Sequence, residues 1–119
     1  FDYAELPVPD DLAGRSLRPL RGKRPGASGH DFVVSQNDLA PDYGGCGAGI
    51  GRMLRTDRFK YARDSTGEAR EPIFDRETDP GERHNLADDP EHAADMNHCR
   101  DLLDTWMRAK GDPFPGLET

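Results

Sequence analysis

The sequence predicts an α+β fold, in which a small four-stranded antiparallel sheet packs against one long C-terminal helix. Two observations predict it. Short β-rich segments separated by turn residues follow one another between residues 31 and 75, and an amphipathic segment follows between residues 90 and 110. Strands joined by hairpins form antiparallel sheets, and one helix can then cover a face of the sheet.

The composition indicates a single domain with a small core. The chain has 119 residues, of which 34% are apolar and 33% charged, and it holds 13 glycines and 10 prolines. Such a lean, loop-rich chain is either marginally stable or covered on one side by another surface. The net charge of −7 argues against a nucleic-acid or anionic-membrane partner, and no apolar run is long enough to span a bilayer.

Each expected element has a local reason. Prolines and glycines interrupt residues 1–29, which we interpret as an extended linker. Residues 31–36 and 50–56 are β-rich and flank a glycine-rich loop over 37–49. Two further strands follow at 59–62 and 72–75, each after a tight turn.

The long helix is predicted from its cap and its apolar stripe. Asp89 can cap a helix whose first residue is Pro90, and Gly111 and Pro113 end it. The apolar residues recur at spacings of three, four and one, and are Ala93, Met96, Cys99, Leu102, Leu103, Trp106 and Met107.

Candidate chemistry is sparse. His92 and His98 do not share a helix face, so we predict no metal site. Cys46 lies in the glycine-rich loop, where backbone N–H groups can lower the pKa of a thiol, but no base lies near it in the sequence. A basic cluster is a candidate anion site or simply a set of surface ion pairs; its members are Arg52, Arg55, Arg58 and Lys60.

Three segments carry a resemblance to a known family. Residues 52–61 and 73–87 resemble the C-terminal signature of sulfatases, and residues 12–20 resemble the stretch that precedes it in that family. The resemblance implies the C-terminal subdomain of an alkaline-phosphatase-like enzyme, with residues 30–119 as the subdomain. Residues 1–29 would connect it to a missing N-terminal catalytic domain.

The resemblance also implies the parent enzyme's chemistry. Sulfatases hydrolyse sulfate esters with a formylglycine made from Cys or Ser in a C/S-x-P/A-x-R motif, and with a divalent cation, usually Ca²⁺. Here Ile50 stands where the motif that starts at Cys46 needs Arg, and Cys99 fails the motif as well. We therefore expect no catalytic residue and no cofactor in this chain, and no activity from the chain alone.

The remaining expectations concern the loop over 37–49 and the surface that another domain would cover. In relatives this loop can face the active-site cleft, so Tyr43, Cys46 and Arg52 are candidate substrate-proximal residues. An isolated subdomain could form a homodimer through its uncovered face or its long helix. Two alternatives stay open, namely a free-standing binding module of this fold and the same subdomain of a phosphonate or phosphate ester hydrolase.

Overall fold

The structure, a computed structural model, describes residues 1–12, 14–21, 29–39 and 49–116. It divides into two compact units, Phe1–Asp31 and Phe32–Thr119, and each is described by itself. Within the described residues, no helix is long and apolar enough to cross a membrane.

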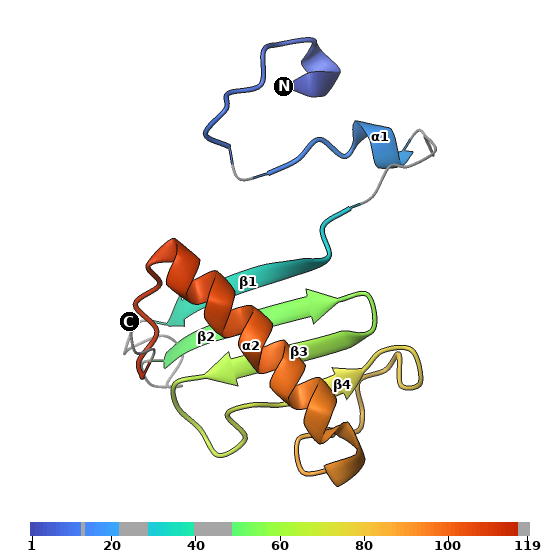
Figure 1. The fold of residues 1–119 in the computed structure, drawn as a ribbon, viewed down its shortest axis with the longest axis vertical. Helices are drawn as coiled ribbons and strands as arrows, with labels where there is room; N and C mark the ends of the chain where they lie inside the picture. The colour runs from blue at the N-terminus through green and yellow to red at the C-terminus, as the bar shows by residue number, and fades with distance from the viewer. Residues whose placement is uncertain (13, 22–28, 40–48, 117–119) are drawn as a thin grey trace. The chain divides into compact units, whose positions relative to one another are not determined.

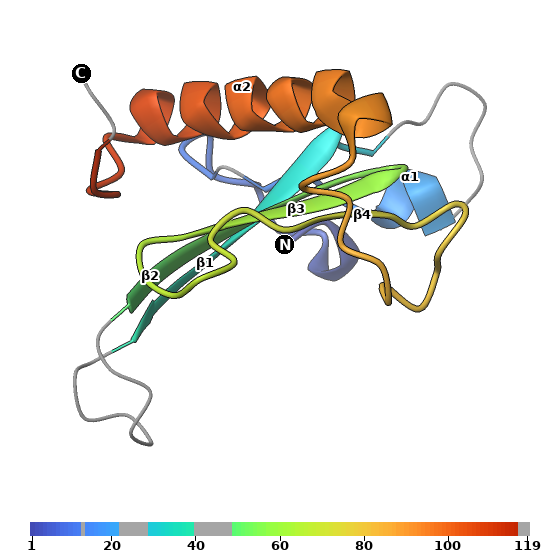
Figure 2. The same ribbon diagram turned by 90° about the horizontal axis from the view of Figure 1, so that it is seen from below.

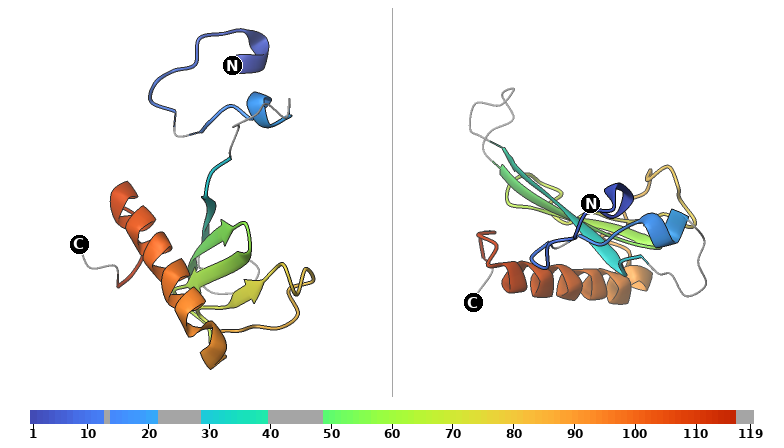
Figure 3. Two further views of the ribbon diagram at one scale, coloured as in Figure 1. Left: turned by 45° about the vertical axis from the view of Figure 1, so that its right-hand side comes forward. Right: turned by 90° about the horizontal axis from the view of Figure 1, so that it is seen from above.

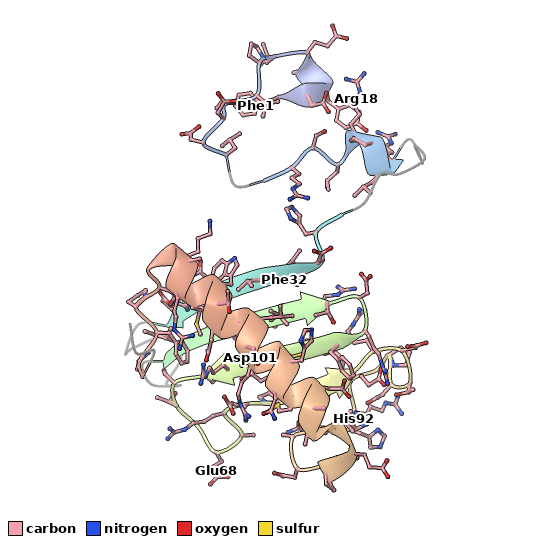
Figure 4. All side chains as sticks on the ribbon, in the orientation of Figure 1. Phe1, Arg18, Phe32, Glu68, His92 and Asp101 are labelled. Carbon is pink, nitrogen blue, oxygen red and sulfur yellow. The ribbon has the colours of Figure 1, made fainter. Side chains whose placement is uncertain are left out.

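The first unit holds two short helical segments within the stretch expected to be extended. They are a 3₁₀ turn, η1 (Asp2–Ala4), and a single helical turn, α1 (Arg18–Arg21). Arg18, which is labelled in Figure 4, donates from Nη1 to Asp2 Oδ1 at 3.1 Å, and its guanidinium lies 5.6 Å from the centroid of the Tyr3 ring. Several large apolar side chains of this unit are exposed, namely Phe1, Tyr3, Leu6, Val8, Leu12 and Leu17.

The second unit contains the predicted sheet and helix (Figure 1). Four antiparallel strands lie in the order β1 (Phe32–Leu39), β2 (Gly49–Thr56), β3 (Phe59–Asp64) and β4 (Ile73–Asp75). A 3₁₀ turn, η2 (Pro90–His92), leads into the long helix α2 (Ala93–Lys110). The predicted fold is therefore confirmed.

Strand β1 is longer than expected. Asn37 pairs with Gly51 and Asp38 with Ile50, so β1 continues into the segment predicted to be loop. Asn and Asp have low intrinsic strand propensity, and here the pairing with β2 determines their conformation instead. The central part of the predicted loop, residues 40–48, lies outside the described residues.

Helix α2 lies over one face of the sheet (Figure 2), and alternation along the strands directs one row of large side chains toward that face. Leu54 pairs with Tyr61, which pairs with Ile73, and all three are buried. The buried core combines them with the inward side of α2 and the segment after it; it comprises Leu54, Phe59, Tyr61, Ile73, Met96, Cys99, Leu103, Met107 and Phe114. Phe32, near the start of β1, packs against its edge (Figure 4).

The ends of the helix follow the predicted signals with one difference. Asp89 Oδ1 accepts the Glu91 N–H at 2.9 Å and Pro90 is the first residue, but the first turn is 3₁₀ and α2 begins at Ala93. Ala93 is exposed, so the apolar stripe starts one turn later, at Met96. At the other end Gly111 has φ 61°, a conformation that glycine adopts without steric cost. The helix lies along one face of the sheet (Figure 3).

Candidate functional site

Arg52 is the predicted site residue that the structure describes, and it is almost completely buried. It lies on β2, three residues beyond the predicted loop, and is 2% exposed. Tyr43 and Cys46 lie outside the described residues, so their proximity to a substrate stays a prediction. The candidate site can therefore be built only from the two strand ends that flank the loop and from their neighbours.

The Arg52 guanidinium ties three segments together. Its Nε and Nη2 donate to the two carboxylate oxygens of Asp112, beyond the end of α2, at 2.9 and 3.0 Å. Its Nη1 donates to Asp38 Oδ1 at 2.8 Å, to the Asn37 carbonyl at 3.1 Å and to the Gly51 carbonyl at 2.8 Å. Every guanidinium nitrogen thus has an acceptor within the chain.

The electrostatics of this pair favour the charged forms of both partners. The hydrogen bonds from Arg52 lower the pKa of Asp112, whose side chain is fully buried, and those bonds raise the pKa of Arg52 in turn. Gln36 Nε2 donates to Asp112 Oδ2 at 2.6 Å, and the Arg52 guanidinium lies 5.9 Å from the Phe114 ring centroid. A two-point, buried ion pair of this kind fixes relative geometry. The contacts of Arg52 and Asp112 in this structure hold segments of the fold together.

The rest of the basic cluster consists mainly of ion pairs. Arg58 Nη2 and Nε lie 2.7 and 3.1 Å from Asp75 Oδ2, and Lys60 pairs with Glu82. The Arg58 guanidinium holds the pKa of the buried Asp75 carboxyl well below its usual range. These contacts favour the interpretation of the basic cluster as a set of ion pairs, and they argue against an anion-binding site.

A second polar network joins β3 to α2. Glu71 accepts from the Tyr61 hydroxyl at 2.9 Å and from Arg100 Nε at 3.0 Å. Burial opposes the charged form of Glu71, but these hydrogen bonds outweigh it and lower its pKa. Burial and the bond to Glu71 raise the pKa of Tyr61, which keeps the phenol protonated. This network packs the helix onto the sheet and leaves no free nucleophile.

No other described strand or helix of residues 32–116 lies on the sheet face opposite α2. Val33 on β1 is 50% exposed, and Met53 on β2 and Phe74 on β4 are partly exposed on the same side. Arg55 and Lys60 also lie on this face, with Lys60 Nζ 6.0 Å from the Phe74 ring centroid. It is a mixed apolar and charged surface, typical of one that another protein surface covers.

A shallow hollow of about 210 Å³ lies on this face, beside the flanks of the predicted loop. Its floor is Gly51, which pairs with Asn37 on one side and Asp64 on the other. A Cβ at Gly51 would lie 2.6 Å from Asp64 Oδ1 and even closer to Asn37 Oδ1, so only glycine fits here without displacing them. The lining is completed by Ser35, Met53 and Ala62 in the next row across the sheet and by Arg52, which follows Gly51 on β2.

Two parts of this arrangement were missed by sequence reasoning. Asp112 follows the helix-ending Gly111, and nothing local shows that it pairs with an arginine 60 residues away. The signal for the hollow was available, because a glycine inside a strand often marks a close approach of neighbouring groups. Gly51 is such a glycine.

The described residues do not fit a resident cation. Among residues 1–12, 14–21, 29–39 and 49–116, no three His, Cys, Asp or Glu side chains come together in a way that could hold a metal ion. Two carboxylates near the flanks of the loop, Asp38 and Asp112, are engaged by Arg52. We therefore derive no step through a metal ion bound to this chain.

The sequence and the fold were compared with those of known proteins. No protein-family model matches the chain. It is 37% identical over 118 residues to a Δ4,5-hexuronate-2-O-sulfatase of Bacteroides thetaiotaomicron, and this match covers 98% of the chain but 24% of that relative. A solved structure of a 2-O GAG sulfatase superposes with a TM-score of 0.82 at 34% identity, over 98% of the chain and 24% of that structure.

The chain matches the C-terminal part of sulfatases. Arylsulfatase K of Rattus norvegicus, 36% identical over 90 residues, is a further relative, and there the match covers 73% of the chain and 16% of the relative. The chain thus spans about a quarter or less of the length of these sulfatases. The predicted family resemblance and the predicted sulfatase C-terminal subdomain are confirmed, and the relatives favour neither a free-standing module nor a phosphonate or phosphate ester hydrolase.

Proposed function

We propose that this chain serves as the non-catalytic C-terminal subdomain of an enzyme that hydrolyses sulfate esters. The observation that carries the proposal is the match of nearly the whole chain, in sequence and in fold, to one quarter of a sulfatase. The ester bond would be cleaved by residues outside this chain, with water as the acceptor and with sulfate and an alcohol as products. Formylglycine and Ca²⁺ would belong to that other part.

The bare sheet face supports a docking role. Helix α2 covers one face of the sheet, and no other described element of residues 32–116 covers the opposite face (Figure 2). Val33 and its neighbours there present apolar surface that is stabilised when another domain packs on it. In this proposal residues 30–119 form the docked subdomain, and residues 1–29 connect it to the catalytic domain.

For the substrate, we propose a 2-O-sulfate ester on the uronic acid of an acidic polysaccharide. One relative is named for a Δ4,5-hexuronate-2-O-sulfate, and the 2-O GAG sulfatase structure has the same regiochemistry in its name. Tyr43, Cys46 and Arg52 are the residues of this chain proposed to lie toward the substrate. Arg52 would act there by holding the flanks of the loop, because its guanidinium nitrogens are occupied by this chain's own acceptors.

A chimera tests the subdomain role. The C-terminal quarter of the Bacteroides thetaiotaomicron hexuronate-2-O-sulfatase is replaced by this chain, and sulfate release from an unsaturated 2-O-sulfated disaccharide is measured by ion chromatography. We expect the chimera to release sulfate, whereas the isolated 119-residue chain does not. A soluble, cooperatively folding chimera that releases no sulfate would contradict the proposal.

A second assay addresses the substrate. The protein encoded by the gene together with its upstream codons is given disaccharides that differ only in carrying a 2-O- or a 6-O-sulfate. Faster release from the 2-O isomer is expected, and a preference for the 6-O isomer would contradict the proposed regiochemistry without affecting the subdomain role.

A homodimer is the proposed state of the subdomain when it is isolated. Its bare face would then be available to a second copy. Sedimentation velocity over a range of concentrations measures this directly, and a single monomeric species throughout would contradict it.

A further inference from the structure

The hollow on the bare sheet face has a defined chemistry. Asn37, Gly51 and Asp64 form one row across β1, β2 and β3, and the absence of a side chain at Gly51 lets the side chains of the other two approach each other above it. Asn37 Oδ1 and Asp64 Oδ1 both lean toward the space above Gly51. Ser35 adds a hydroxyl at its rim. The Asp64 carboxylate presents only hydrogen-bond acceptors to the hollow, and the Asn37 amide and the Ser35 hydroxyl can also accept.

Asp64 is the charged group of the hollow, and nothing within the described residues neutralises it. None of the ion pairs among residues 1–12, 14–21, 29–39 and 49–116 includes Asp64, although other carboxylates of this unit, such as Asp112, Asp75 and Glu71, are paired with arginine. The neighbouring Arg52 points its guanidinium to the other side, toward Asp112. Partial burial raises the pKa of Asp64.

We infer that this hollow is a socket for one lysine or arginine side chain of the catalytic part of the sulfatase. The inference rests on the proposed function, since this side chain would come from the three quarters of a sulfatase that this chain does not span. Charge complementarity selects a cation, because a carboxylate flanked by an amide oxygen and a hydroxyl binds an ammonium or guanidinium group through charge-assisted hydrogen bonds. The hollow's size limits it to a single side chain.

The position of the hollow on the sheet also supports a side chain of the catalytic part as its occupant. Helix α2 lies on one face of the sheet (Figure 3), and the hollow lies on the other face, so a domain that docks there would cover it. Apolar contacts through Val33 and Met53 beside the hollow would exclude water from the ion pair. An ion pair shielded in this way contributes both to affinity and to the register of the two surfaces.

A thiol reporter in the hollow tests the inference in the active sulfatase that carries this subdomain. Ser35→Cys places a thiol at the rim, and its modification by a maleimide is followed at the peptide level by mass spectrometry. In the active sulfatase we expect Cys at position 35 to react at least roughly tenfold more slowly than in the isolated chain, because the docked side chain covers it.

Removal of the charge should undo that protection. Asp64→Asn keeps the shape of the side chain, and Asp64→Lys reverses its charge; each should raise the reaction rate in the active sulfatase roughly tenfold or more, since a charge-assisted hydrogen bond is lost. Asp57→Lys, an exposed aspartate in the turn between β2 and β3, makes the same charge change away from the hollow and should leave the rate unchanged.

The possible results separate the two proposals. Equal reaction rates in the isolated chain and in a sulfatase that still releases sulfate would show that the face is not docked, which overturns the socket and leaves the subdomain role intact. Protection that survives both Asp64 variants would show docking without the ion pair, and it also overturns the socket. Failure of the proposed function is seen separately, as the absence of sulfate release from the unmodified sequence.

Discussion

Arg52 on β2 and Asp112 beyond α2 form a buried ion pair with two hydrogen bonds, of 2.9 and 3.0 Å. The pair joins the middle of the sheet to the segment that follows the helix, and through Asp38 it also reaches the end of β1. Neither partner has room to exchange its bonds for water, because the Arg52 and Asp112 side chains are 1% and 0% exposed.

Arg52→Ala should destabilise the chain strongly, because it leaves the Asp112 carboxylate buried without a partner. We expect a loss of about 3 kcal/mol in the free energy of unfolding, measured with urea. Arg55→Ala, an exposed arginine three residues further along the same strand, is the matched control and should change stability by less than about 0.5 kcal/mol. Equal effects of the two variants would argue against the importance of the buried pair.

Gln36→Glu places a second carboxylate beside Asp112. The Gln36 amide now donates to Asp112 Oδ2 at 2.6 Å, and a carboxylate at that position cannot donate when ionised. The expected cost is about 1 kcal/mol at neutral pH. This cost should shrink on acidification as the new carboxyl group becomes protonated, so a loss independent of pH would point to another cause.

Acid should weaken the fold through Asp75 and Asp112. Hydrogen bonds from Arg58 and Arg52, respectively, lower the pKa values of these two carboxyls below their ordinary value of 3.8. Both groups therefore stabilise the folded state above that value, and the stabilisation is lost as the pH falls below it. Urea unfolding at a series of pH values should show the decline, and Asp75→Asn should be less stable at neutral pH but show a shallower decline.

Cys99 should behave as an unreactive core thiol. It is fully buried on the side of α2 that faces the sheet, and burial, with a smaller contribution from Asp95, raises its pKa to about 11. Iodoacetamide at mildly alkaline pH should leave it unmodified in the folded protein and modify it once urea unfolds the chain. Modification under native conditions, with the far-ultraviolet circular dichroism unchanged, would contradict the described packing.

The strands and the helix were predictable because each has a signal within its own segment of the sequence. The helix has its cap at Asp89 and its stop at Gly111, and the alternation around Phe59 and Tyr61 has the period of a strand. The extension of β1 through Asn37 and Asp38 was not predictable in this way, since it depends on pairing with β2.

The same difference between local and long-range signals applies to the candidate site. Arg52 could be selected from the sequence as a residue near the loop, but its role depends on Asp112, which folding brings to it from 60 residues away. The hollow likewise forms from three strands, and only Gly51 hints at it within its own segment. Both the Arg52–Asp112 pair and the hollow depend on contacts between segments that are distant in the sequence.

The segment beyond α2 also sets a practical boundary for recombinant work. Asp112 neutralises Arg52, and Phe114 is buried in the core, so both belong to the folded body although they follow the last helix. A protein trimmed at Lys110 would lose the counter-ion of a buried arginine together with an aromatic core residue. Affinity tags and fluorescent fusions therefore belong after Gly116, where they leave both anchors in place.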